Sequence, residues 1–238
     1  MRRRSRVAAL AAAATALVVI ALAGCASPKA GPTATATASS VPTATATATS
    51  APTPTATAGN VPTEQGSWII DFDTLAGVRV GQPIASFGQA AGLVRQQDTV
   101  DCPPGFSSTT PVDGEPDNQL SVSFLQADSR GTADVADPTF TLGLVFARTS
   151  PDAVQPGSPA TTAGIRVGST EAALLAAYPN LQKGSSKYDE STGARTYFLG
   201  PQDGRYLVFN VRPTPDGSGV TVNTIQTSTY NSIIDVCD

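Results

Sequence analysis

The chain has 238 residues, a length that allows one or two domains of ordinary size. Its formal net charge is −4, from 15 Lys and Arg against 19 Asp and Glu, and charged residues make up only 14%. The sequence contains no histidine, which excludes His-based catalytic triads and His-ligated metal sites. Its three cysteines are too few for a closed four-thiolate zinc site.

Residues 1–24 have the layout of a secretory signal peptide. Arg2, Arg3, Arg4 and Arg6 form a positive segment ahead of an apolar run over residues 7–23. The run ends in Leu22-Ala23-Gly24-Cys25, which resembles the lipobox of bacterial lipoproteins. In that family the signal is cut before the cysteine, whose sulfur carries a diacylglyceryl group, so the resemblance implies lipidation of Cys25. The alternative is an uncleaved transmembrane anchor, because about 18 apolar residues can just span a bilayer.

Lipidation implies an exported protein held on the outer face of the cell membrane, as in Gram-positive bacteria. A diacylglyceryl cysteine supplies the two chains that stable anchoring needs. Removal of residues 1–24 takes away four arginines and leaves 11 basic and 19 acidic residues, a net charge of −8. Such a negative charge disfavours binding to nucleic acid and to anionic lipid headgroups. We therefore expect membrane contact through the lipid anchor and no nucleic-acid partner.

Residues 25–63 are expected to form a lipid-anchored, disordered linker. Ala, Thr, Pro and Ser dominate this segment, and Lys29 is its only charged residue. It lacks the apolar area that would offset the chain entropy lost on folding. The Thr and Pro content also resembles O-glycosylated stalks, with an unmodified spacer as the alternative. The folded part is expected over residues 64–238.

The folded part contains an internal sequence repeat. Residues 76–81 read Ala-Gly-Val-Arg-Val-Gly, and residues 163–168 read Ala-Gly-Ile-Arg-Val-Gly, 87 positions later. The match divides the folded part into repeats of about residues 66–160 and 161–238. Glycines at this spacing are more typical of tight turns than of a phosphate-binding loop.

A short helix is predicted after each copy of this motif. The first begins at Gln82-Pro83 and ends at Gly92, since proline is favoured at the first helical position. The second begins at Ser169-Thr170-Glu171 with a serine cap and ends at Pro179. Apolar residues spaced as one helical face are Ile84, Phe87 and Ala91 in the first helix, and Ala173, Leu174, Ala177 and Tyr178 in the second.

Strands are predicted after each helix. Alternating apolar residues indicate them over residues 120–124, 140–146, 196–199, 206–211 and 220–227. Asp203-Gly204 and Asp216-Gly217 are predicted hairpin turns between the last three. A short helix followed by an antiparallel meander, twice, predicts an α+β fold with the helices on one sheet face.

This order of elements resembles two families. The glycine-bounded turn, short helix and meander are similar to the α/β repeat of β-lactamase-inhibitor-protein-like domains. The outer-membrane assembly lipoprotein family once called small protein A has a similar unit. Members of both families bind other proteins, so the resemblance implies a binding module. Pro179 stands where these families usually have a glycine, and no binding residue carries over.

Cys102 and Cys237 are predicted to form a disulfide. With Cys25 lipidated, they are the remaining pair, and an even pair in an exported domain is typical of a disulfide. The bond would pin the C-terminal tail to the first repeat. The alternative is two free, buried thiols.

Two groups of acidic residues are candidate sites. Asp113, Glu115 and Asp117 lie on a predicted loop and offer oxygen ligands for Ca²⁺, but a solvated acidic loop fits their spacing better. Asp71 and Asp73 alternate with Phe72 on a predicted strand. They are a candidate catalytic carboxylate pair, with an exposed strand face as the alternative.

Together these features predict a membrane-anchored lipoprotein whose folded part is a non-catalytic protein-interaction module without metal or cofactor. The sequence has neither a Gly-x-Ser-x-Gly nor a Ser-x-x-Lys nucleophile motif. One alternative is a protein that binds a small ligand or cell-wall fragment in a cleft between the repeats. A second is a carboxylate-dependent hydrolase.

Overall fold

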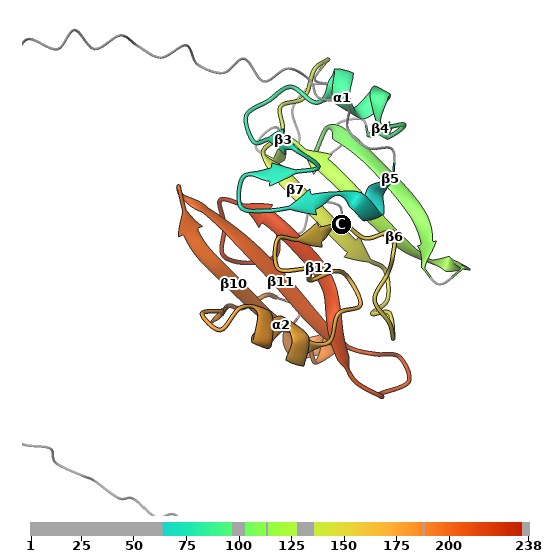
Figure 1. Cartoon of the computed structure of the whole chain (residues 1–238), viewed down its shortest axis with the longest axis vertical. Helices are drawn as coiled ribbons and strands as arrows, with labels where there is room; N and C mark the ends of the chain where they lie inside the picture. The colour runs from blue at the N-terminus through green and yellow to red at the C-terminus, as the bar shows by residue number, and fades with distance from the viewer. Residues whose placement is uncertain (1–63, 97–102, 113, 128–135, 188, 235–238) are drawn as a thin grey trace, which may run out of the picture. The chain divides into compact units, whose positions relative to one another are not determined.

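The computed structural model describes residues 64–96, 103–112, 114–127, 136–187 and 189–234, all of them in the unit Thr53–Asp238 (Figure 1). The predicted signal peptide and linker lie outside the described residues. So do Cys25, Cys102, Asp113 and Cys237. None of the described helices has the length and apolar character needed to cross a membrane.

The described residues form an α+β fold that is mostly β, with two sheets. The larger has eight antiparallel strands, in the spatial order β4 (Val94–Gln96), β5 (Gly105–Val112), β6 (Glu115–Leu125), β7 (Leu142–Ala147), β12 (Val220–Ser228), β11 (Arg205–Pro213), β10 (Arg195–Gln202) and β9 (Gln182–Lys183). This order runs forward along the chain from β4 to β7 and backward from β12 to β9. The two series meet where Leu144 of β7 lies opposite Gln226 of β12.

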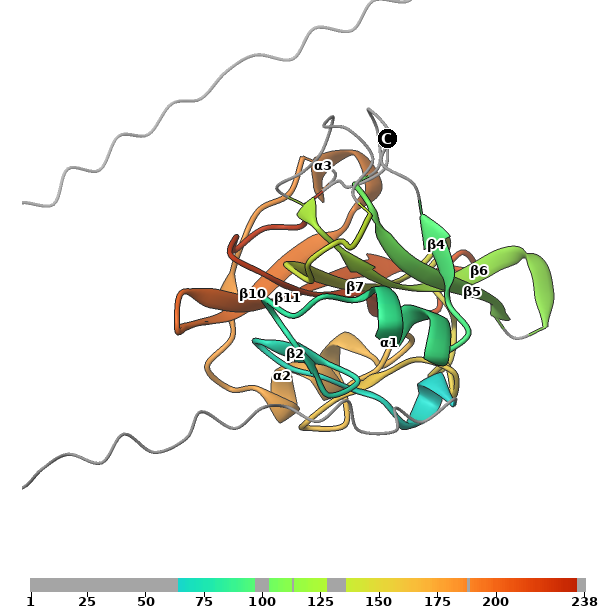
Figure 2. The same cartoon turned by 90° about the horizontal axis from the view of Figure 1, so that it is seen from above.

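The smaller sheet is made of two-residue strands. Its order is β3 (Val78–Arg79), β2 (Thr74–Leu75), β1 (Ile69–Ile70) and β8 (Ala160–Thr161), with β1 and β8 parallel. The sequence did not predict this sheet. Figures 1 and 2 show it lying across one face of the larger sheet, and we call this the helix face because α1 (Ala85–Ala90) and α2 (Glu171–Ala177) lie on it too.

The helices differ from the prediction in four respects. The first begins at Ala85, later than expected, because Pro83 forms an isolated bridge with Thr139. The second is capped by Thr170 rather than Ser169, and its apolar face excludes Ala173, which is exposed. A further short helix, α3 (Asp189–Thr192), lies on the opposite face of the large sheet, so the helices do not all share one face (Figure 2).

The main core lies between the large sheet, on its helix face, and the small sheet that covers it. Phe124 is at the centre of four aromatic side chains there. Its ring centroid lies 6.0 Å from that of Trp68, 4.8 Å from that of Phe87 and 5.3 Å from that of Phe140. Phe140 was expected within a strand but precedes β7. The predicted strand over residues 140–146 is otherwise confirmed, and it is buried on both faces because Val145 and Leu144 belong to different apolar clusters.

The opposite face of the large sheet carries a smaller apolar cluster. Leu125, Leu142 and Leu144 form it, and Ile234 packs against them. Ile234 belongs to residues 229–234, the segment after β12, which we call the strap. Gln226, which is fully buried, holds the strap: its Nε2 donates to the carbonyl of Ser232 at 3.1 Å, and its Oε1 accepts from the Ile234 amide at 3.0 Å.

Candidate functional site

The two aspartates proposed as a catalytic pair lie in the bend between β1 and β2, not on a strand. The Asp71 carboxylate accepts a hydrogen bond from the Phe72 amide at 2.8 Å. The Asp73 carboxylate pairs with Arg79 at 3.3 Å, and its side chain is 45% exposed. Each carboxylate therefore stabilises the local bend. The strand prediction was wrong because β1 ends at Ile70.

The acidic residues proposed for calcium fall on a strand rather than a loop. Glu115 and Asp117 belong to β6, and both are exposed. Asp113 lies outside the described residues. Across the described part of the chain, no group of three Cys, Asp or Glu side chains is placed to hold a metal ion.

These two acids belong to a hairpin that projects from the large sheet. β5 and β6 pair along their whole length, but β4 pairs only with residues 105–107 of β5, and β7 only with residues 120–125 of β6. Residues 109–117 therefore have no strand partner outside the hairpin among the described residues. Figure 2 shows this part extending beyond the neighbouring strands. We call residues 109–117 the projecting hairpin.

The projecting hairpin is exposed and yet anchored. Among its described residues only Val112 is buried, at 1% exposure, and it belongs to the main core. Next to it, the Thr149 amide donates to Asn118 Oδ1 at 3.1 Å, and the Arg148 amide donates to the Gln119 carbonyl at 3.0 Å. These contacts fix the direction of an element whose other described residues are exposed.

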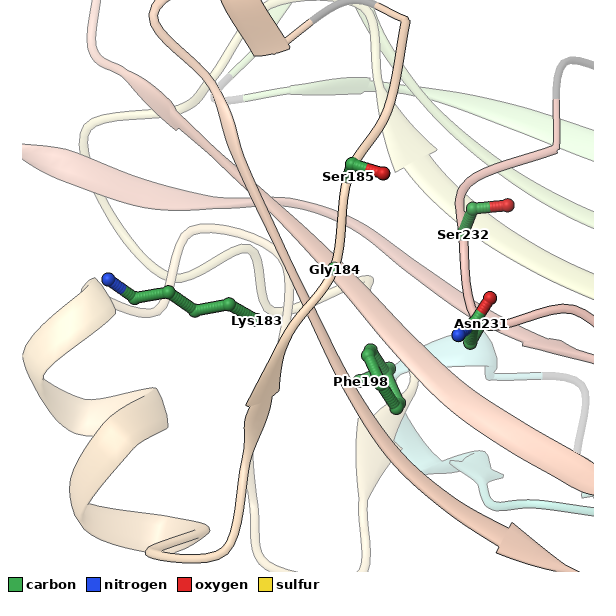
Figure 3. A pocket seen from close by; sticks show the side chains of 6 residues that line it. All are labelled: Lys183, Gly184, Ser185, Phe198, Asn231 and Ser232. Carbon is green, nitrogen blue, oxygen red and sulfur yellow. The ribbon is translucent and has the colours of Figure 1, made fainter. Parts of the chain in front are cut away.

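A pocket lies on the strap side of the large sheet, at its β9 edge. Its volume is ≈ 410 Å³, and its lining residues are Lys183, Gly184, Ser185, Phe198, Asn231 and Ser232 (Figure 3). We call it the edge pocket. It lies between β9 and its following segment on one side and the strap on the other, with Phe198 of β10 between them. This position is at one end of the sheet and within residues 161–238, whereas a ligand cleft was expected between the two repeats.

An ionic cluster joins α2 to β10 on the helix face. Arg195 Nε donates to Glu171 Oε1 at 2.6 Å, and the Tyr197 hydroxyl donates to the same oxygen at 2.8 Å. The hydrogen bond from Arg195 holds the pKa of Glu171 below its ordinary value. Burial, followed by the bond to Glu171, raises the pKa of Tyr197. Because each group is the partner of another, the cluster acts as an anchor for α2.

The sequence contains only weak signals for the projecting hairpin and the edge pocket. The strand β5, which forms half of the projecting hairpin, reads Gly-Phe-Ser-Ser-Thr-Thr-Pro-Val. Because most of these residues are small and polar, β5 lacks the alternation of apolar and polar residues that predicts a strand. The threonines and Phe106 were the remaining strand signal. The edge pocket draws its lining from segments almost 50 positions apart, so no local pattern marks it. Comparisons with protein-family models, curated proteins and solved structures found no match for this chain.

Proposed function

We propose that this chain is a membrane-anchored, extracytoplasmic lipoprotein whose folded part is a non-catalytic protein-interaction module, and that the projecting hairpin is its contact element. The observation that carries the proposal is that the described residues of this hairpin are exposed except Val112, which is buried and fixes the hairpin in place. A two-stranded ribbon gains little stability of its own in water. Its extension beyond the sheet therefore favours a role outside the fold, and its fixed direction reduces the ordering cost of binding.

The composition of the projecting hairpin indicates the kind of partner. Its sequence contains Asp113, Glu115 and Asp117 and no basic residue, so a partner with a basic surface would be attracted to it. Pro111 and Pro116 lack an amide proton, and proline on an edge strand opposes the addition of another strand. We therefore favour recognition through side chains over extension of the sheet by the partner.

The test is capture of the partner by the full chain from membranes solubilised in mild detergent, after crosslinking. The variant Glu115→Lys with Asp117→Lys reverses two exposed charges on the hairpin. The matched control, Asp152→Lys with Glu190→Lys, reverses two exposed charges elsewhere. We expect a stoichiometric partner with the wild type and the control, and a loss of at least about tenfold in recovery with the hairpin variant. Equal recovery by all three proteins would contradict the proposal.

The membrane anchor has a separate test. Substituting Cys25→Ala removes the sulfur that would carry the diacylglyceryl group, so the protein should leave the membrane fraction or accumulate as a longer precursor. Fractionation and intact mass measure both outcomes. A Cys25→Ala protein that is still processed and still requires detergent would rule out lipidation at this residue.

We further propose that residues 66–160 and 161–238 are two copies of one unit, as the sequence repeat suggests. The turn glycines Gly81 and Gly168 have similar φ angles, 89° and 86°. The Gly81 amide donates to the carbonyl of Phe140, and the Gly168 amide donates to that of Val222, both at 2.8 Å.

The hydrogen bonds that run in the opposite direction, from the strand segment back to the turn, also correspond in the two halves. The Phe140 amide donates to the Gln82 carbonyl at 2.9 Å, and the Val222 amide donates to the Ser169 carbonyl at 2.8 Å. In the first half, the turn before the helix is thus bonded to the segment that leads into β7. In the second half, the corresponding turn is bonded to β12 itself. β7 and β12 are the two central strands of the large sheet. The agreement supports the resemblance to β-lactamase-inhibitor-protein-like repeats, whose members bind proteins.

A further inference from the structure

The edge pocket offers hydrogen-bonding side chains that no other residue in the described part of the chain uses. The hydroxyls of Ser185 and Ser232 and the carboxamide of Asn231 make no hydrogen bond to another described residue. They come from the two sides of the pocket, as Figure 3 shows. Together they supply both donors and acceptors, because a hydroxyl and a carboxamide each do both.

Among the described residues that line the pocket, none has a charged group that faces its interior. Lys183 contributes to the lining, but Figure 3 shows its side chain extending away from Ser185 and Ser232. Lys183 lies opposite Tyr197 in the ladder, so it projects to the helix face, where its charge lowers the pKa of Glu171. The other lining residues are uncharged. An ionic ligand would meet no counter-charge on the described side chains that face the pocket, and its partial burial there would be unfavourable.

The floor of the pocket is apolar and rigid. Phe198 packs edge-on against Tyr206, with 5.7 Å between ring centroids and an interplanar angle of 80°. Gly184 lies against the strap so closely that a Cβ on it would come within 3.1 Å of the Asn231 carbonyl. The strap itself is held by Gln226. The floor and the strap are therefore held by contacts within the protein, which lowers the cost of binding.

We propose that the edge pocket binds an uncharged, hydroxyl-rich ligand of the saccharide class. Sugar hydroxyls match the unused hydroxyl and amide groups, and the C–H face of a sugar ring matches the Phe198 floor. A volume of ≈ 410 Å³ lies within the range of ~300–1,000 Å³ usual for small-molecule sites. This binding is separate from the protein contact assigned to the projecting hairpin.

The test is saturation-transfer NMR and titration on the full chain in detergent micelles. The neutral probes are N-acetylglucosamine and methyl β-glucoside, and the charged probes are glucuronate and glucosamine. The variants are Asn231→Asp, which replaces an amide donor by a charge at an exposed position, and Ser185→Ala. Gln89→Glu makes the same type of change on exposed Gln89 of α1, on the helix face, and is the matched control.

We expect neutral probes to bind at one site and charged probes to bind at least about fivefold more weakly. Asn231→Asp and Ser185→Ala should each weaken the neutral probes by about two- to tenfold, as expected for one lost hydrogen bond, and Gln89→Glu should leave them unchanged. The proposal is overturned if no neutral probe binds, if the charged probes bind more tightly, or if the control weakens binding as much as Asn231→Asp does.

Discussion

Arg205, at the start of β11, fastens the large sheet to the bend between β1 and β2. Its side chain is buried, at 8% exposure for the residue. Its Nε donates to the carbonyl of Phe72 at 2.8 Å, and its Nη2 donates to that of Thr141 at 2.9 Å. Burial lowers the pKa of Arg205 from its ordinary value, although a guanidinium stays charged at neutral pH. Two segments far apart in the sequence thus depend on one side chain.

Replacing Arg205 should therefore be costly. Arg205→Leu leaves the Phe72 and Thr141 carbonyls without their donors, and we expect a loss of about 3 kcal/mol in the free energy of unfolding. Arg205→Lys should recover part of this, since an ammonium can reach one carbonyl but lacks the planar fork. Urea denaturation measures both, with exposed Arg148→Leu as the control. A loss below about 1 kcal/mol for Arg205→Leu would show that solvent replaces the guanidinium.

Glu171 predicts a pH dependence. The hydrogen bond from Arg195 lowers its pKa below the ordinary value of 4.5, so the charged form is favoured in the folded protein. The stabilisation is then fully present above pH 4.5 and is lost as the pH falls through the lowered pKa. Because the Arg195 side chain is 46% exposed, we expect Glu171→Gln to cost only about 0.5–1 kcal/mol at pH 7.

The measurement compares the wild type with Glu171→Gln in urea at pH 7 and at a series of pH values below 4.5. The difference between the two proteins should shrink as the pH falls through the lowered pKa, since both then carry an uncharged side chain at this position. A difference that stays constant across this range would mean that Glu171 acts through shape and not through charge.

At the scale of the element, α2 begins with a single capping bond. The Thr170 hydroxyl accepts from the Ala173 amide at 3.1 Å, whereas the Ser169 hydroxyl accepts from the Arg166 amide at 3.0 Å. Thr170→Ala should cost about 1 kcal/mol, and Thr170→Ser should cost little, because serine retains the acceptor. Thermal unfolding of the two variants measures this. An equal loss for both would show that the threonine methyl group, and not the cap, is what matters.

Elements with a clear period were predictable from the sequence. The strands β10, β11 and β12 match the predicted ones, and the turn at Asp203-Gly204 has the expected positive φ angles of 49° and 75°. The small sheet was not predictable, because a two-residue strand shows no alternation. Ile70 and Leu75 form strands there because the core buries them completely, which is a tertiary effect.

The candidate sites were predictable only in part. The exposure of Glu115 and Asp117 agrees with the prediction that the acidic residues are solvated. Their place on a projecting strand, however, does not follow from composition. The extent of that hairpin depends on where β4 and β7 stop pairing. The edge pocket depends on the strap folding back over β10, which Gln226 directs from inside the sheet.

At the scale of the whole molecule, the Cys102–Cys237 disulfide remains a prediction, and the described residues nearby favour it. The Pro104 carbonyl accepts from the Gln126 amide at 3.0 Å, next to Leu125 at the end of β6. Ile234, three positions before Cys237, packs against the cluster that contains Leu125. Pro104 thus pairs with the residue that follows β6, and Ile234 packs against the cluster that includes the last residue of β6.

Reduction should therefore destabilise the folded part. The bond would close a loop of more than 130 residues, and its loss should cost about 2–5 kcal/mol, with a melting temperature lower by several degrees. Cys102→Ser with Cys237→Ser should melt as the reduced wild type does. A non-reduced digest analysed by mass spectrometry should contain the linked peptides. Two alkylatable thiols in the freshly isolated native protein would refute the bond.

If the two repeats proposed above are copies of one unit, the strand order of the large sheet has an evolutionary consequence. A sheet that reads β4 to β7 from one edge and β9 to β12 from the other is the order that two identical four-stranded chains produce when they join by their last strands around a two-fold axis. The β7–β12 contact thus occupies the place of a subunit interface in such a homodimer. Fusing the two genes would make that association independent of concentration and free each half to diverge, one keeping a hairpin and the other a pocket.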